Sequence, residues 1–283
     1  FPMKVENSEE TKWVLIQSTN PGGYNGGSAT QYFVGNWDGK NFTPEADLHG
    51  KNIDHPYWLD FGKDNYAGVT WSNIPKEDGR TLFMGWMSNW LYAQEVPTET
   101  WRSAMTIARK LTLKKEDDKY IITSTPVKEL EKYIGETITK WKVTDEDHAI
   151  IDTNELDLTK AQVSFLIPKI TKDVHLSLSN DSGDHFKFGF KKAENEFYID
   201  RSESGITDFG KEFASTISTG RRISTSDSLQ VNMILDNMSI EVFYDDGETV
   251  MTEIFFPKQP YTSLKINEGV PVIDIEANEF NFN

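Results

Sequence analysis

The sequence predicts an all-β fold, and three observations support this prediction. Apolar residues occur in short runs rich in β-branched and aromatic side chains, such as Trp13–Gln17 and Leu229–Leu235. Gly, Asn, Asp and Pro separate these runs, as is typical of strands joined by tight turns. Apolar residues alternate with others in segments such as Lys187–Phe190, which indicates strands with one face in a core.

The predicted strands follow one another along the chain, and hairpin turns join several of them. Asp38-Gly39, Asp78-Gly79 and Asp246-Gly247 mark such turns, because Asp and Gly tolerate the positive φ angles that tight turns need. In chain order the predicted strands are Trp13–Gln17, Gln31–Val34, Tyr66–Trp71, Thr81–Trp86, Ala104–Ala108, Tyr120–Thr123, Val163–Ile167, Val174–Leu178, Phe186–Phe190, Phe197–Ile199, Leu229–Leu235, Ser239–Tyr244 and Val250–Phe256.

A change in composition divides the chain into two predicted domains. Seven of the eight Trp residues lie within the first 101 residues, whereas at least seven short strands with sandwich-like alternation follow residue 138. Pro126–Ile134 has the spacing of a short helix, and a Ser-Thr pair directly before it can cap that helix. We therefore predict a first domain at residues 1–125, a linker with a short helix at 126–138, and a two-sheet β-sandwich at 139–283.

The first domain contains a weak internal repeat. A strand that begins at Trp13 leads to Asn36-Trp37, and a strand that begins at Tyr66 leads to Asn89-Trp90, an offset of 53 residues in both cases. Roughly 40 to 50 residues is the size of one four-stranded propeller blade, so the first domain is predicted to hold about two blades. Two blades cannot close a ring, and we therefore expect N-terminal blades to be absent from this sequence.

Composition excludes several functions and sites. The 29 basic and 45 acidic residues give a net charge of −16, which disfavours binding to nucleic acid. No apolar run approaches the roughly 18 residues that would span a bilayer, so no membrane insertion is expected. The absence of Cys excludes thiolate chemistry, and the five His residues lack metal-ligand spacing. We expect neither a metal nor another cofactor.

Three segments together resemble glycoside hydrolase family 32, which comprises invertases, inulinases and levanases. The resemblance implies a five-bladed β-propeller followed by a β-sandwich, and retaining, exo-acting hydrolysis of β-linked fructose in levan, inulin or sucrose. It also implies an extracellular or periplasmic location, because polymeric fructan is met outside the cytoplasm. The segments that carry the resemblance are Trp58–Trp71, Gly79–Leu111 and Tyr198–Ser202, the last followed by Ser239–Phe243 and Phe256-Pro257.

The motifs that carry the catalytic carboxylates of this family are missing from the sequence. Trp-Met-Asn-Asp-Pro-Asn-Gly, Arg-Asp-Pro and Glu-Cys-Pro-Asp-Leu-Phe hold the nucleophile, the transition-state Asp and the acid/base Glu of the family, and none of them occurs here. The resemblance therefore assigns no catalytic residue to this chain. It implies the C-terminal part of a fructosidase, inactive alone, with fructose-containing saccharides and the N-terminal part of the same protein as partners.

The same resemblance implies five substrate-binding residues: Asp60, Tyr66, Trp86, Asn89 and Trp90. Trp86 is expected to stack on a sugar ring, with Asn89 and Trp90 extending that surface. Asp60 and Tyr66 are expected at the pocket wall, where Asp60 accepts hydrogen bonds from sugar hydroxyls or holds a neighbouring side chain.

Other interpretations compete with these assignments. Most Trp residues of a propeller pack between blades. Asp60 and Asp64 resemble a catalytic pair, but carboxylates in such a turn more often cap backbone N–H groups. The sandwich alone is also compatible with a non-catalytic carbohydrate-binding or interaction module, although its single Trp argues against a flat aromatic platform for sugars.

Overall fold

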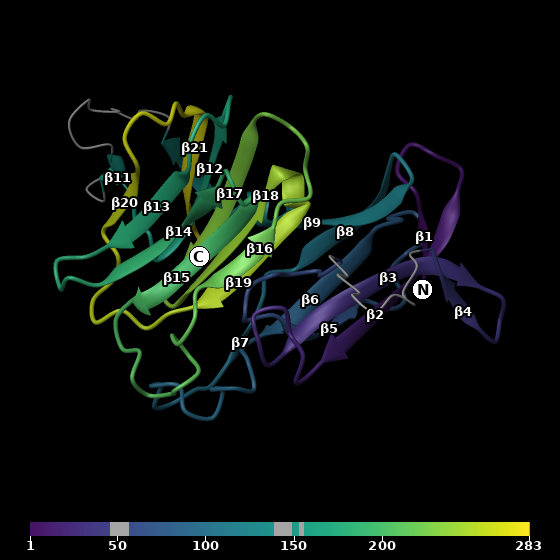
Figure 1. Ribbon diagram of the computed structural model, residues 1–283, viewed down its shortest axis with the longest axis horizontal. Coiled ribbons are helices and arrows are strands. Elements are labelled where there is room, and N and C mark those ends of the chain that lie inside the picture. The colour runs from purple at the N-terminus through teal and green to yellow at the C-terminus, as the bar shows by residue number, and fades with distance from the viewer. Residues whose placement is uncertain (46–56, 139–148, 153–155, 283) are drawn as a thin grey trace.

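A computed structural model describes residues 1–45, 57–138, 149–152 and 156–282. In these residues the chain forms four antiparallel sheets, grouped into an N-terminal and a C-terminal half (Figure 1). The all-β prediction is thus confirmed. Among the described residues, no helix is long and apolar enough to cross a membrane.

The N-terminal half consists of two small sheets that share one core. Their apolar residues, including Met3, Tyr32, Phe83 and Leu113, meet in a buried cluster between the sheets. The first sheet has the order β1 (Pro2–Lys4), β2 (Thr11–Thr19), β3 (Ala29–Trp37) and β4 (Phe42–Pro44). The second has the order β5 (Tyr66–Thr70), β6 (Thr81–Met87), β8 (Arg109–Glu116) and β9 (Lys119–Pro126), with the short β7 (Ala104–Met105) paired to β6.

The C-terminal half is built from two six-stranded sheets that enclose the largest core. Strand β12 shows how the sequence specifies this packing, because Ala161, Val163, Phe165 and Ile167 alternate with half-buried residues and are fully buried. One sheet has the order β10 (Ile134–Ile138), β21 (Ile273–Phe280), β12 (Lys160–Ile167), β17 (Leu229–Asp236), β18 (Ser239–Tyr244) and β19 (Thr249–Ile254). The other has the order β11 (Ala149–Asp152), β20 (Ser263–Ile266), β13 (Val174–Ser179), β14 (His185–Lys191), β15 (Glu196–Glu203) and β16 (Ser218–Arg221).

The turns predicted from Asp-Gly pairs are present. Gly39, Gly79 and Gly247 all have positive φ angles, of 96°, 65° and 79°. The carboxylate of Asp38 accepts hydrogen bonds from the backbone N–H groups of Lys40 and Asn41, which fixes the β3–β4 hairpin.

The segment 126–138 differs from its prediction in the type of helix. It forms a six-residue 3₁₀ helix, η1 (Lys128–Tyr133), which is followed directly by strand β10 of the sandwich sheet. No side chain caps η1, and its apolar residue Leu130 packs against the cluster of Ile234, Phe243 and Phe280. Tertiary packing and the pairing of β10 with β21 therefore override the helical spacing.

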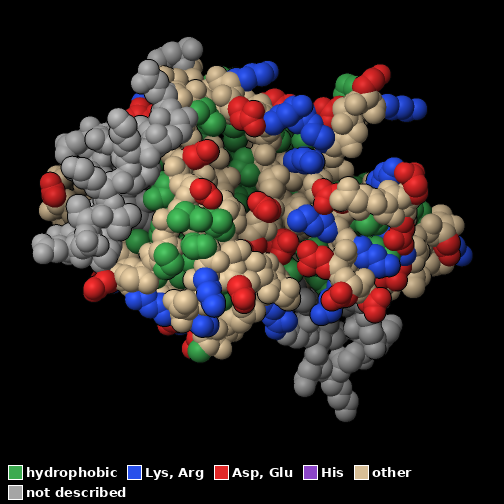
Figure 2. Space-filling model, turned by 90° about the horizontal axis from the view of Figure 1, so that it is seen from above, with side chains coloured by type: hydrophobic (Ala, Val, Ile, Leu, Met, Phe, Trp, Pro, Cys, Tyr) green, Lys and Arg blue, Asp and Glu red, His purple; other side chains and the backbone are tan. Residues whose placement is uncertain are grey.

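The two halves meet across the outer face of the sheet that contains β18 and β19. Apolar contacts at this interface involve Ile107 from the N-terminal half and Ile234 and Phe243 from the sandwich. The short 3₁₀ helix η2 (Asp245–Gly247) lies against β9, where a Cβ on Gly247 would come within 2.1 Å of the Ser124 carbonyl oxygen. Basic and acidic side chains are interspersed over the face of the molecule shown in Figure 2.

Candidate functional site

Three aromatic side chains form a partly exposed cluster at the end of β6. Tyr66 on β5 is directly opposite Trp86 on β6 in the strand pairing, and their rings lie 6.2 Å apart in an edge arrangement. The ring of Trp90 lies 5.1 Å from that of Trp86 and is 49% exposed. Alternation along β6 buries Phe83 and Met87 and places Trp86 on the opposite face. The structure thus brings together three of the five residues predicted to bind substrate.

Asn65 packs against the backbone of β6 at Gly85, directly before Trp86. A Cβ on Gly85, the residue before Trp86, would come within 2.2 Å of Asn65 Oδ1, so only glycine fits there. Thr106 Oγ1 accepts a hydrogen bond of 3.0 Å from the Gly85 backbone N–H, and Asn65 Nδ2 donates one of 3.2 Å to Asp60 Oδ2. The backbone beneath Trp86 is therefore held on both sides.

Asp60 lies at the interface between the two halves and is only 1% exposed. Its Oδ1 accepts hydrogen bonds of 2.9 Å from the backbone N–H groups of Gly62 and Thr252. Its Oδ2 accepts from Thr252 Oγ1 at 2.6 Å and from Arg109 Nη1 at 2.9 Å. Of the two roles expected for Asp60, the contacts observed are those of a group that holds neighbouring side chains.

Arg109 links Asp60 to the sandwich. Its guanidinium is fully buried and donates to Glu241 Oε2 through Nη2 at 2.5 Å and through Nε at 3.1 Å, and to Thr252 Oγ1 at 2.7 Å. Burial raises the pKa of the Glu241 carboxyl, while the neighbouring Arg109 acts to lower it. Sequence reasoning missed both residues, because each is paired with a group more than a hundred positions away.

Asp64 belongs to a second buried network at the same interface. Arg201 Nη1 on β15 lies 2.8 Å from Asp64 Oδ2 and 2.7 Å from Glu253 Oε2. The hydroxyl of Tyr92 donates to Asp64 Oδ1 at 2.7 Å and accepts from Arg201 Nη2 at 2.7 Å. Asp64 Oδ2 also accepts from the backbone N–H of Ile254 at 3.0 Å.

The two aspartates therefore act as structural carboxylates in this structure. Asp60 accepts a hydrogen bond from the Gly62 backbone N–H within the predicted turn, whereas Asp64 accepts one from the distant Ile254 backbone N–H. Both carboxylates are paired with buried arginines. A general acid or nucleophile must be free to contact the substrate, and neither carboxylate is.

Asn89 is fully buried, away from the exposed face of the aromatic cluster. Its amide donates to the carbonyl oxygens of Gly26, Ser28 and Lys63 at 3.2, 3.3 and 2.9 Å. Its carbonyl accepts from the backbone N–H groups of Ser28 and Leu91 at 3.2 and 3.0 Å. Asn89 thus ties the loop that contains Gly26 and Ser28 to the loop that carries Trp90, and its side chain is occupied by these backbone partners instead of extending the aromatic surface.

No group of three or more His, Asp or Glu side chains that could hold a metal ion is present in the part of the chain that the structure describes. The oxygen-rich segment Asn180–Asp184 forms the β13–β14 turn, in which Asn180 Oδ1 accepts from the backbone N–H groups of Ser182 and Asp184 at 3.0 and 3.1 Å.

Comparison with known families matches almost the whole chain. The model described as "Glycosyl hydrolases family 32 N-terminal domain" matches residues 1–126, and "Glycosyl hydrolases family 32 C terminal" matches residues 129–279. The chain belongs to glycosyl hydrolase family 32. The family predicted from the sequence motifs is thereby confirmed.

Relatives of known sequence include levanase and exo-inulinase. The levanase of Bacillus subtilis (strain 168) is 35% identical over 283 residues, which cover 96% of this chain and 40% of the levanase. The extracellular exo-inulinase inuE of Aspergillus niger is 30% identical over 299 residues, which cover 99% of this chain and 53% of the inulinase. This family 32 chain therefore spans 40 to 53% of the length of these two relatives.

Solved structures of the family superimpose on the chain. The exo-inulinase from Aspergillus awamori gives a TM-score of 0.81 at 25% identity, covering 100% of this chain and 56% of that one. The β-fructofuranosidase from Schwanniomyces occidentalis, complexed with fructosyl-erythritol, gives 0.77 at 25% identity, covering 99% and 59%.

Proposed function

We propose that this family 32 chain forms the C-terminal part of a retaining, exo-acting β-fructosidase that hydrolyses levan, inulin or sucrose. Residues 1–125 supply about two blades of a five-bladed propeller, and residues 139–283 supply the sandwich. Support comes from the named activities of the relatives and from the antiparallel sheets of the N-terminal half. The substrate class and the exo-inulinase relative named as extracellular favour a location outside the cytoplasm.

The observation that carries the proposal is the partly exposed aromatic cluster of Tyr66, Trp86 and Trp90. A furanose ring presents an apolar C–H face that suits a flat aromatic side chain, and the indole N–H supplies one hydrogen-bond donor. Trp86 stacks on the fructosyl unit, while Tyr66 and Trp90 form the wall beside it. Asp60 and Asn89 contribute indirectly, by holding Asn65 and the Trp90 loop in place.

Hydrolysis itself requires groups that this chain does not supply. A retaining glycosidase needs a nucleophilic carboxylate and a protonated carboxyl group about 5–5.5 Å apart, on either side of the scissile bond. The family motifs for both are missing, and Asp60 and Asp64 are occupied by arginines and backbone N–H groups. The 283-residue chain alone is therefore inactive, and its second partner is the N-terminal part that carries these carboxylates.

Binding of a fructo-oligosaccharide tests the role of the aromatic cluster. We expect titration with kestose or nystose to change the Trp fluorescence of the wild type, and Trp86→Ala to weaken this binding about three- to tenfold. Trp37→Ala serves as the control, because it removes another exposed Trp, on β3 and 49 residues before Trp86 in the sequence. Equal affinity of wild type and Trp86→Ala would overturn the assignment.

A further inference from the structure

Glu241, on strand β18 of the sandwich, contacts two different segments of the N-terminal half with its two carboxylate oxygens. Oε2 accepts hydrogen bonds from the Arg109 guanidinium on β8, and Oε1 accepts one of 2.8 Å from the backbone N–H of Ile107. The residue is only 2% exposed. These two contacts begin two paths through the N-terminal half, and both paths end at Gly85, the residue directly before Trp86 on β6.

The first path runs through the segment between β7 and β8. Glu241 holds the backbone of Ile107, and the residue before it, Thr106, makes two hydrogen bonds to Gly85. The Thr106 backbone N–H donates to the Gly85 carbonyl oxygen at 2.9 Å, and Thr106 Oγ1 accepts from the Gly85 N–H at 3.0 Å. Both backbone groups of Gly85 are therefore bonded to a residue whose neighbour is anchored on the sandwich.

The second path runs through the buried side chains of Arg109, Asp60 and Asn65. Arg109 Nη1 donates to Asp60 Oδ2 at 2.9 Å, and Asn65 Nδ2 donates to the same oxygen at 3.2 Å. Asn65 Oδ1 lies against Gly85 and has no hydrogen-bond partner among the described residues. The bond to Asp60 therefore sets the position of the amide, and the amide limits where the backbone of Gly85 can lie.

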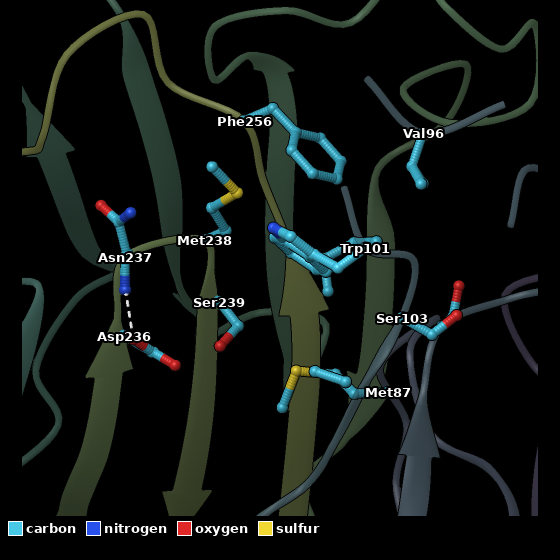
Figure 3. Close-up of a pocket in the computed structure, with 12 residues that line it drawn as sticks. Met87, Val96, Trp101, Ser103, Asp236, Asn237, Met238, Ser239 and Phe256 are labelled. Carbon is cyan, nitrogen blue, oxygen red and sulfur yellow. Dashed lines mark hydrogen bonds between the residues drawn. The ribbon is translucent and has the colours of Figure 1, made fainter. Parts of the chain in front are cut away.

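The residue after Trp86 is anchored on the sandwich as well. Met87 belongs to a buried cluster with Ile254 and Phe256. Figure 3 shows its side chain directed toward the strands of the sandwich, at the wall of a cavity of about 240 Å³ between the two halves. Alternation along β6 places Trp86 on the opposite face of the strand. The sandwich thus fixes the backbone on both sides of Trp86, directly at Met87 and through Glu241 at the residue before.

We propose that Glu241 is a positioning residue for sugar binding, which acts through Thr106 and Asn65 to set the orientation of the Trp86 ring. This inference rests on the proposed stacking of Trp86 on a fructosyl unit. A binding surface that is held in its bound geometry before the ligand arrives loses less conformational entropy on binding, and its affinity is higher for that reason. The sandwich therefore contributes to the affinity for sugar although Glu241 does not touch the sugar.

Glu241→Gln in the full chain tests the proposal, because an amide has one acceptor oxygen where the carboxylate has two. Either the Ile107 N–H or the Arg109 guanidinium then faces an N–H group. We expect the variant to bind nystose about three- to tenfold more weakly in calorimetry. We also expect the near-ultraviolet circular dichroism of Trp86 to change, measured as the difference between each protein and the same protein with Trp86→Phe.

Asp245→Asn is the matched control. Asp245 is also a buried carboxylate of the sandwich paired with a buried arginine, Arg222, but this pair lies within the sandwich. We expect Asp245→Asn to leave the nystose affinity and the Trp86 signal unchanged. Equal changes in the two variants would overturn the proposal, because the loss of any buried carboxylate would then have the same effect. Wild-type affinity and an unchanged Trp86 signal in Glu241→Gln would also overturn it.

Asn65→Ala removes the last contact of the second path without changing a buried charge, so it decides the question if thermal melting shows that Glu241→Gln does not fold. A changed Trp86 signal in Asn65→Ala supports the proposal, and an unchanged signal overturns it. Absence of nystose binding to the wild type would contradict the proposed function instead. The Trp86 signal, which needs no ligand, then tests the positioning role by itself in the same variants.

Discussion

Gly247 lies at a close contact between the two halves, where η2 packs against β9. Its φ is +79°, and a Cβ there would come within 2.1 Å of the Ser124 carbonyl oxygen on β9. Gly183 in the β13–β14 turn has nearly the same φ, +80°, but open space around it. The pair therefore separates the cost of the backbone conformation from the cost of the close contact.

We expect Gly247→Ala to destabilise the protein by about 3 kcal/mol, because it adds a clash with backbone to an unfavourable φ angle. Gly183→Ala carries only the conformational cost, about 1 kcal/mol. Chemical denaturation measures both. Equal losses of unfolding free energy in the two variants would contradict this expectation, because they would mean that η2 can move away from β9 without loss of stability.

Glu248 follows Gly247 at the same interface and makes stability depend on pH. Burial, followed by the nearby negative charge of Glu116, raises the pKa of the Glu248 carboxyl from 4.5 to about 7. Lys114 Nζ lies 3.6 Å from Glu248 Oε1 and lowers this pKa, but it offsets only part of the increase. Because the unfolded chain releases this proton near pH 4.5, folding loses stability as the pH rises from there through 7.

Replacing Glu248 by Gln removes this titration. Relative to the wild type, Glu248→Gln is expected to gain about 1–2 kcal/mol of unfolding free energy at pH 8, after allowance for solvent screening. At pH 4 the wild type and Glu248→Gln should have similar unfolding free energies, because Glu248 is then protonated in the folded protein. Melting temperatures measured from pH 4 to 8 provide the comparison, and a constant difference across that range would show that Glu248 does not titrate between these limits.

At the scale of elements, two buried ion networks fasten the strands of one half to those of the other. Arg109 on β8 pairs with Asp60 and with Glu241 on β18, and Arg201 on β15 pairs with Asp64 and Glu253. Removing one partner of a buried pair leaves an uncompensated charge, which costs far more than the pair contributes. These contacts make the sandwich a packing partner of the N-terminal half.

Arg109→Met is therefore expected to lower the unfolding free energy by about 3–5 kcal/mol, since Asp60 and Glu241 lose their common cation. Arg80→Met is the control, because Arg80 pairs with Asp78 and Glu129 near the surface, where the loss of an ion pair changes the unfolding free energy little. Urea denaturation distinguishes the two. A loss for Arg109→Met no larger than that of the control would contradict the structural role of the network.

The sequence predicted those elements that local patterns specify. Strands such as β12 and β17 follow from alternation, and the Asp-Gly turns follow from the positive φ angles they need. Strands β8 and β21 were missed, because charged residues interrupt their apolar pattern and neighbouring strands decide their conformation. The helical spacing of Pro126–Ile134 corresponds to η1, and strand β10, which follows it directly, was missed as well.

For the candidate site, the motifs identified the aromatic residues but not their supports. Tyr66, Trp86 and Trp90 lie within 25 residues of one another, in two neighbouring segments that both carry the family resemblance. The arginine partners of Asp60 and Asp64 lie 49 and 137 residues away, beyond any local pattern. Two buried carboxylates in one turn do require cations nearby, and this requirement is the signal that sequence reasoning left unused.

At the scale of the whole molecule, the N-terminal half exposes several apolar side chains, which further blades would cover if this half is part of a propeller, as proposed above. Leu15 on β2, Val69 on β5 and Trp71 after β5 are all exposed. We expect this chain to self-associate through these residues, and Leu15→Lys with Val69→Lys to reduce the association. Ile217→Lys changes an exposed apolar residue of the sandwich half and is the control.

Static and dynamic light scattering measure the association. Monodisperse, monomeric behaviour of the wild type at tens of micromolar would contradict the expectation that further blades cover this surface. An effect of Ile217→Lys equal to that of the double variant would place the contact in the sandwich instead.

Release of fructose from sucrose, inulin and levan by the 283-residue chain tests the central claim most directly, with intact mass confirming that only these residues are present. The claim is that the chain supplies part of a fructose-binding wall but not the catalytic carboxylates. It predicts no release above that of a buffer blank or of Trp86→Ala. Release by the wild type that exceeds the Trp86→Ala level would contradict it, because carboxylates within this chain, Asp60 and Asp64 first, would then perform the hydrolysis.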